Sequence, residues 1–215
     1  MPASPIFANM LTVRYMQIRD IPEVLVIDRA SFTPAWPERS YRFELNESQV
    51  SYMVVLERRE EQPITGLRKF FRQLSGEYDP TEQMPIIVGY GGLWKIEEEA
   101  HISTIASHPE YRGNKYGEIV LASMVKRAMA LKAGYVVLEV RVSNIVAQNL
   151  YKKYGFEIRG VKKGYYHHDK EDAYDMRLEF DEASLAKVEA LYTELQKKVA
   201  FQNEYSDTLH PRLKK

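Results

Sequence analysis

The chain has 215 residues, with 30 basic and 30 acidic side chains, 45% hydrophobic residues and no cysteine. This length suits one generous domain, and the hydrophobic content is enough for a packed core. The lack of cysteine excludes disulfides, thiolate metal sites and any acyl-cysteine intermediate. Zero net charge argues against direct nucleic-acid recognition through a chain-wide positive field, although it leaves room for a local basic patch.

No stretch of the sequence approaches the roughly 20 apolar residues that cross a bilayer. Residues 1–10 have neither the basic nor the apolar region of a secretory signal, so we interpret them as an N-terminal tail. We therefore expect a cytoplasmic protein that does not engage a membrane.

The first third of the chain predicts two strands around a pair of helices. Alternating apolar residues indicate the strands, and Asp20 is the expected N-cap of the first helix. The expected elements are a strand at Leu11–Gln17, helices at Asp20–Phe32 and Glu38–Leu45, and a strand at Ser51–Glu57.

Residues 58–85 form a charged segment with several glycines and prolines, which we interpret as an insertion. Leu67, Phe70, Phe71 and Leu74 have the spacing of one short amphipathic helix. A connection this long in a compact domain is either a functional lid or simply a mobile loop, and the sequence leaves both open.

The rest of the chain alternates strands and helices, which is typical of a mixed α/β domain. Glycines 89, 91 and 92 predict a bulge or a close backbone approach, and Gly134 is expected to end the longer helix. The nearly all-apolar segment 135–142 predicts a strand buried on both faces. The expected strands are Ile86–Ile96, His101–Ser107, Tyr135–Val142, Phe156–Val161 and Ala173–Phe180, and the expected helices are Tyr116–Lys132 and Asn144–Tyr154.

Beyond Asp181, apolar residues recur at spacings of three and four and predict a helix with a narrow apolar seam. The seam is too short for a coiled coil, so docking onto the domain is favoured over self-association. The seam residues are Leu185, Val188, Tyr192, Leu195 and Val199, and the residues after them are expected to be a frayed tail.

The segment Ile105–Gly117 carries the clearest chemical signal. A strand runs into a basic, glycine-bearing loop that opens a helix, and the free N–H groups of a helix N-terminus bind phosphate well. Arg112 adds a cation, while Gly113 and Gly117 permit close backbone approach. The alternative is an ordinary strand-to-helix loop with a solvated arginine.

This loop resembles motif A of the GCN5-related N-acetyltransferases (GNAT superfamily), whose Arg/Gln-x-x-Gly-x-Gly/Ala pattern holds the pyrophosphate of acetyl-coenzyme A (acetyl-CoA). Arg112 and Gly117 match the ends of the pattern, and Lys115 stands in place of the central glycine. Leu138–Phe156 resembles motif B in the form found in ribosomal-protein-alanine and related protein N-terminal acetyltransferases. Matches to that subfamily continue at Ser31-Phe32, at Trp36 and over Gly164–Leu178.

The resemblance implies an α/β (α+β) GNAT fold: a central mixed, mostly antiparallel sheet flanked by helices, with an extra C-terminal helix. The acetyltransferase domain would span residues 11–181, and residues 182–215 would form that helix and a tail. The implied activity is acetyl-CoA-dependent acetylation of a protein or peptide N-terminus, including that of a ribosomal protein, by direct transfer. Acetyl-CoA is the cosubstrate, no metal is required, and the chain acts as a monomer or a dimer.

The resemblance also implies site residues. The acceptor groove would be lined by Trp36, Tyr165 and Tyr166. The coenzyme would be bound by Ile105, Ala106, Arg112, Gly113, Asn114, Lys115, Tyr116, Gly117 and Asn144. Without the resemblance, Asn144 is a plain helix N-cap.

Glu139 is the candidate general base. It alternates with Leu138 and Val140 on a predicted buried strand and shares its face with Val137 and Arg141. It is either an ion-pair partner of Arg141 or a base whose pKa burial raises toward a useful value. The resemblance favours the base, because the matching family position is the proposed general base.

Tyr151 is the candidate general acid. It lies on the apolar stripe of its helix, so core packing is the simpler interpretation, whereas the matching family tyrosine protonates the coenzyme sulfur. The histidines lack metal-site spacing and are interpreted as solvated or hydrogen-bonded. Lys152, Lys153, Lys162 and Lys163 form either a basic patch or a solvated face.

Two other functions remain open at the level of sequence. A small-molecule amine acetyltransferase would have the same coenzyme-binding half of the active site and a different acceptor-binding half. A non-catalytic acetyl-CoA-binding module is the third candidate, because lysine at position 115 is costly where the family has glycine.

Overall fold

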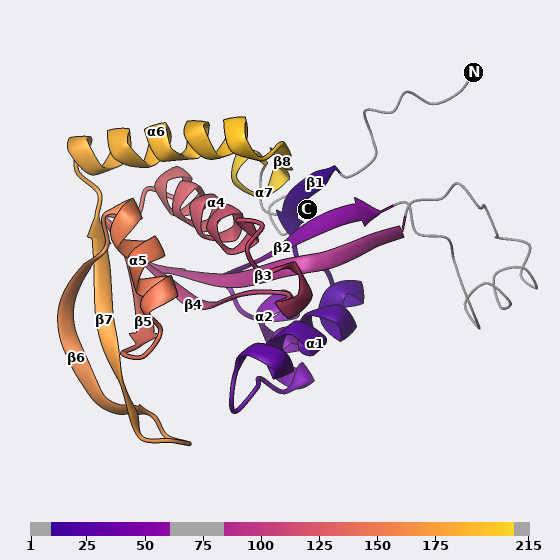
Figure 1. Cartoon of the computed structure of the whole chain (residues 1–215), viewed down its shortest axis with the longest axis horizontal. Helices are drawn as coiled ribbons and strands as arrows, with labels where there is room; N and C mark the ends of the chain where they lie inside the picture. The colour runs from indigo at the N-terminus through magenta and orange to yellow at the C-terminus, as the bar shows by residue number, and fades with distance from the viewer. Residues whose placement is uncertain (1–9, 61–83, 209–215) are drawn as a thin grey trace, which may run out of the picture.

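One mixed eight-stranded sheet forms the centre of the computed structural model, which describes residues 10–60 and 84–208 (Figure 1). Its strand order is β6-β7-β5-β4-β3-β2-β1-β8. The β4–β5 and β1–β8 pairs are parallel, and the remaining neighbours are antiparallel, which confirms the predicted mixed, mostly antiparallel sheet. The strands are β1 (Leu11–Tyr15), β2 (Ser51–Glu60), β3 (Met84–Ile96), β4 (Glu99–Ser107), β5 (Tyr135–Arg141), β6 (Glu157–Tyr166), β7 (Glu171–Glu179) and β8 (Phe201–Asn203).

Helices cover both faces of the sheet (Figure 1). α4 packs its apolar side on one face, with α5 beside it and α6 running along their outer side, and α1 and α2 cover the other face. The α-helices are α1 (Ile21–Ser31), α2 (Glu38–Asn46), α4 (Tyr116–Ala130), α5 (Ile145–Tyr154), α6 (Glu182–Lys198) and α7 (Glu204–Asp207), with short 3-10 helices η2 (Ile18–Asp20) and η3 (Pro109–Tyr111).

The glycines of β3 let α4 lie close to the sheet. A Cβ atom on Gly91 would stand 2.8 Å from the Met124 sulfur, which is closer than real Cβ contacts. The register of the β3–β4 pair also shifts after Gly92, so both the predicted close approach and the predicted bulge are present.

β4 and β5 pair over only three residues each, Glu99–His101 with Tyr135–Val137. Both strands continue beyond this short ladder. Over the rest of their length, the edge of β4 that faces β5 and the edge of β5 that faces β4 pair with no other described strand. The two strands therefore diverge, and the opening between them is the place where cavities form.

Two local predictions were wrong. β5 is buried on one face only, because Val136, Leu138 and Val140 enter the core while alternate residues stay partly exposed. α4 is ended by Lys132 in the left-handed conformation (φ 55°), not by Gly134. The Lys132 and Ala133 N–H groups bond to the Met129 and Ala128 carbonyls, which is the Schellman pattern.

The C-terminal helix docks onto the domain, as expected from its seam. Val188, Tyr192 and Leu195 are buried, and Lys126 of α4 pairs with Glu189 at 2.5 Å. The frayed-tail prediction was wrong for the residues that follow. β8 pairs with β1, and Tyr205 of α7 is completely buried.

The segment between β2 and β3 is shorter than the predicted insertion at residues 58–85, because β2 continues to Glu60 and β3 starts at Met84. The short helix predicted around Phe70 lies outside the described residues. Among the helices of residues 10–60 and 84–208, none is long and apolar enough to cross a membrane.

Candidate active site

A cavity of about 640 Å³ lies between the end of β4, the start of α4 and the start of α5. It is the site predicted for the coenzyme, and it brings together eight of the nine residues proposed for that role. They are Ile105, Ala106, Arg112, Gly113, Lys115, Tyr116, Gly117 and Asn144.

Asn114, the ninth residue, does not line this cavity and instead shapes the loop. Its side-chain NH₂ donates to the carbonyls of Tyr111 and Arg112, at 3.0 and 3.4 Å. Asn144 has a position that suits both roles considered from the sequence, coenzyme contact and helix N-cap. It lines the cavity, and it also caps α5 by accepting the Ala147 N–H at 3.1 Å.

The start of α4 offers both charge and room to an anion. The first intrahelical bond runs from the Ile119 N–H to the Lys115 carbonyl, so the N–H groups of residues 116–118 precede the helical ladder. A Cβ on Gly113 would meet nothing within 4 Å, and one on Gly117 would reach only Ser107 Oγ at 4.0 Å. These residues therefore fit a pyrophosphate group, with Arg112 as the adjacent cation.

Lys115 has a left-handed backbone conformation. It is the N-cap of α4 with φ 64°, and its ammonium lies 3.7 Å from the Glu118 carboxylate. A left-handed backbone is strained for an L-residue and unstrained for glycine. Lysine at this position therefore introduces local backbone strain at the start of α4.

This strain can be measured with two variants that both lack the ammonium. We expect Lys115→Gly to be more stable to urea unfolding than Lys115→Ala by about 1 kcal/mol, because only the alanine has a Cβ in the left-handed region. Equal stability of the two variants would contradict the observed φ angle.

A second cavity of about 360 Å³ adjoins the first, and both are lined by Ile105, Asn144 and Tyr151. All three residues predicted for the acceptor, Trp36, Tyr165 and Tyr166, line this second cavity. The coenzyme half and the acceptor half of the predicted site are thus neighbours in space.

Buried groups hold the acceptor residues in place. Asp28 accepts the Trp36 N–H at 2.7 Å and the Tyr41 hydroxyl at 2.8 Å, and the Trp36 ring stacks on Trp94 with centroids 6.3 Å apart. These contacts fix the loop that enters α2 against the wall of the cavity.

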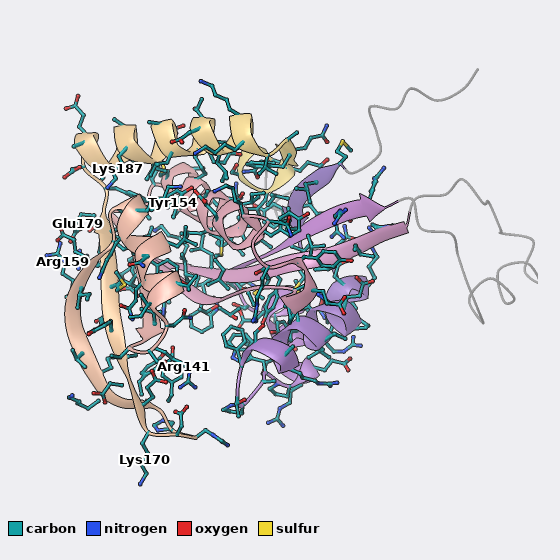
Figure 2. The ribbon with its side chains drawn as sticks, in the orientation of Figure 1. Arg141, Tyr154, Arg159, Lys170, Glu179 and Lys187 are labelled. Atoms are coloured by element: carbon teal, nitrogen blue, oxygen red, sulfur yellow. The ribbon has the colours of Figure 1, made fainter. Side chains whose placement is uncertain are left out.

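Arg141 holds the β6–β7 hairpin. Its guanidinium lies 3.8 Å from the Tyr166 ring centroid and pairs with Asp169 and Glu171 at 2.7 and 2.6 Å. Figure 2 shows Arg141 beside this hairpin, with Lys170 at its tip. The Glu139–Arg141 ion pair considered from the sequence is therefore absent, since Arg141 has other partners.

Tyr151 stands where the two cavities meet. Its side chain is 5% exposed, and its ring packs on Phe156 with centroids 5.9 Å apart, as core packing requires. Burial, assisted by the nearby Tyr166, raises the pKa of the phenol above its ordinary value. The hydroxyl is therefore protonated at neutral pH, and it forms no hydrogen bond with the described residues.

Glu139 differs from the expectation. Burial alone would raise its pKa, but hydrogen bonds and charge interactions with His101 and Lys162 outweigh burial and lower the pKa to about 2. His101 Nε2 lies 2.8 Å from one carboxylate oxygen, and Lys162 Nζ bonds the other. The prediction of a raised pKa was wrong, because two hydrogen-bonding partners reach Glu139 from other strands, His101 from the adjacent β4 and Lys162 from β6, on the far side of β7.

His101 and Lys162 were missed as site residues. Lys162 looked like part of a basic run, yet the structure separates that run: Lys153, Lys162 and Lys163 pair with Glu118, Glu139 and Asp172 respectively. Only the pairing of β4 with β5 and of β6 with β7 brings His101 and Lys162 to Glu139. Within the described parts of the chain, no group of three or more metal-ligating side chains is present.

Comparison with known proteins tests this interpretation. The model of the acetyltransferase (GNAT) family matches residues 21–156. The chain belongs to the GNAT family. It is therefore an acetyl-transferring enzyme, and the predicted GNAT fold is confirmed.

Several proteins to which the chain is similar are named as N-acetyltransferases. A Bacillus subtilis (strain 168) protein, provisionally named a ribosomal protein bS18-alanine N-acetyltransferase, is 35% identical over 79% of this chain and 96% of its own. An N-alpha-acetyltransferase of Sulfurisphaera tokodaii is 30% identical over 76% of this chain and 90% of its own. The crystal structure of the ribosomal-protein-S18-alanine N-acetyltransferase from Escherichia coli shares the fold, with a TM-score of 0.59, 20% identity, and coverage of 79% of this chain and 94% of that one.

Proposed function

We propose that this GNAT enzyme uses acetyl-CoA to acetylate the α-amine of a protein N-terminus, of the ribosomal-protein-alanine type, by direct transfer. The observation that supports this most is the position of Tyr151, a protonated phenol on the wall shared by the coenzyme cavity and the acceptor cavity. The proposed setting is the cytoplasm, and the proposed enzyme acts as a monomer or a dimer.

Acetyl-CoA supplies an activated acyl group as a thioester. In this proposal, Arg112 and the N-terminus of α4 bind the pyrophosphate, and the backbone of β4 at Ile105 and Ala106 orients the thioester along the strand edge that β5 leaves open. Trp36 and the β6–β7 hairpin hold the acceptor chain.

In the transfer step the amine nitrogen forms a bond to the acetyl carbon, and the carbon–sulfur bond breaks. Tyr151 donates its proton to the departing sulfur. The ionised Glu139 on the wall of the acceptor cavity attracts the acceptor ammonium and holds the water that carries the ammonium proton to solvent, backed by His101. With no cysteine in the chain, no acyl-cysteine stage is needed.

Glu139→Gln tests the second half of this step. We expect kcat/KM for the peptide to fall by about 100-fold, because the amide has no charge with which to hold the ammonium and its water. Steady-state kinetics would measure the loss. Glu157→Gln is the matched control, since Glu157 pairs with Arg159 at 3.3 Å and lines neither the coenzyme nor the acceptor cavity. An unchanged kcat/KM in Glu139→Gln would remove Glu139 from the mechanism.

The acceptor class is tested by incubating the enzyme with acetyl-CoA and a library of peptides with free N-termini, read by mass spectrometry. Acetylation of α-amines, with alanine first residues preferred, supports the proposal. Acetylation confined to lysine side chains or polyamines would favour a small-molecule amine acetyltransferase. Absence of acetyl-CoA binding in isothermal titration at millimolar ligand would contradict both.

A further inference from the structure

The Glu139 carboxylate has one partner on each oxygen, and the partners come from different strands. Lys162 of β6 bonds Oε1, and His101 of β4 bonds Oε2 at 2.8 Å. An ionised carboxylate can only accept hydrogen bonds, so His101 Nε2 must carry the hydrogen of that bond.

Lys162 lines a different cavity from the one predicted for the acceptor. A third cavity, of about 480 Å³, is lined by His101, Glu139 and Lys162, whereas of these three only Glu139 also lines the acceptor cavity. Glu139 thus stands between the two spaces and is only 9% exposed, while Lys162, at 43%, reaches solvent.

We propose that Lys162 is a positioning residue: by bonding Oε1 it holds the Glu139 carboxylate with Oε2 turned toward His101. The proposal rests on the proposed function for its catalytic meaning. It predicts that the orientation and the acidity of the carboxyl group on the acceptor wall depend on an ammonium that does not line the acceptor cavity.

The charged and titratable groups around Glu139 bear on this. Those that interact with it or with Lys162 come from three strands besides its own: His101 from β4, Lys162, Tyr165 and Tyr166 from β6, and Asp175 from β7. Glu99, Arg159, Arg177 and Glu179 line the same third cavity. Lys162 is the cation that bonds the carboxylate. Because a nearby positive charge favours the carboxylate form, its removal must raise the pKa of Glu139, and it cannot lower it.

The chain provides a matched control in the next residue. Lys163 is 82% exposed and pairs with Asp172, so Lys163→Met removes a charge of the same sign from the same strand without touching Glu139. Lys162→Arg keeps the cation and should behave like the wild type. Lys162→Met keeps the aliphatic stem and removes only the charge.

The first measurement is the titration of the Glu139 carboxyl by ¹³C NMR. We expect the midpoint to rise by about 1 pH unit or more in Lys162→Met, and to stay unchanged in Lys163→Met and Lys162→Arg. An unchanged midpoint in Lys162→Met, or the same rise in Lys163→Met, would overturn the inference. This measurement needs no turnover, so it is decisive even if the proposed acceptor proves wrong.

The second measurement is kcat/KM for the peptide at neutral pH, where Glu139 is ionised in every variant. We expect Lys162→Met to lower it several-fold and Lys162→Arg to restore it, while the acetyl-CoA affinity from isothermal titration stays within about twofold of the wild type. A loss that Lys162→Arg does not restore, or that Lys163→Met shares, would also overturn the inference.

Discussion

Tyr151→Phe is expected to lower kcat by about 100-fold, because a positioned general acid contributes roughly 10²–10⁴ to the rate. Phenylalanine keeps the ring that packs on Phe156 and removes only the hydroxyl at the junction of the two cavities. The acetyl-CoA dissociation constant, measured by isothermal titration, should stay within about twofold of the wild type. The hydroxyl is expected to act in the transition state and not in binding the coenzyme.

Tyr154→Phe is the matched control for this variant. Tyr154 lies on the same helix, is fully buried and donates its hydroxyl to Glu118 at 3.3 Å, but lines neither of the two cavities. Its loss should cost about 1 kcal/mol of stability with kcat unchanged. If Tyr151→Phe weakens coenzyme binding as much as it slows turnover, Tyr151 serves packing and not proton transfer.

Tyr205→Ala is expected to destabilise the whole domain by about 3–5 kcal/mol, the usual cost of truncating a buried aromatic side chain. Tyr205 is completely buried, its ring lies 4.8 Å from that of Tyr15, and its hydroxyl donates to the Tyr52 carbonyl at 2.8 Å. Urea unfolding followed by circular dichroism would measure the change in the midpoint.

Tyr205→Phe separates the ring from the hydroxyl, and it should cost only about 1 kcal/mol. Both variants should shift one cooperative transition, because Tyr205 packs against strands β1 and β2 of the central sheet. A separate early transition in Tyr205→Ala, with the main midpoint unchanged, would show that the residues after α6 are not part of the domain core.

Most of the fold could be predicted, because local sequence patterns indicate most of its helices and strands. Apolar alternation identified the strands, helical spacing identified α4 and the docking face of α6, and the glycines of β3 predicted the close approach of α4. The loop from Arg112 to Gly117 was identified by a motif whose residues are contiguous, and it does line one cavity.

Two of the failures share one physical cause, which is that the deciding contacts are distant in sequence. Glu139 was expected to have a raised pKa, but its partners His101 and Lys162 lie 38 and 23 residues away and meet it only through strand register. The three-residue strand β8 has no periodicity of its own and is defined by β1, nearly 200 residues earlier. The end of α4 was predicted wrongly for a local reason. Lys132 takes the left-handed backbone conformation that was expected of a glycine, Gly134.

The strand order places the two ends of the described chain together, since β1 and β8 pair at one edge of the sheet. The hairpin that carries Tyr165 and Tyr166 forms the opposite edge, as Figure 1 shows. A support or carrier protein attached through residue 10 or residue 208 would therefore sit across the molecule from the acceptor cavity. A tether at either of these points would leave the β6–β7 edge of the sheet free of the attached protein.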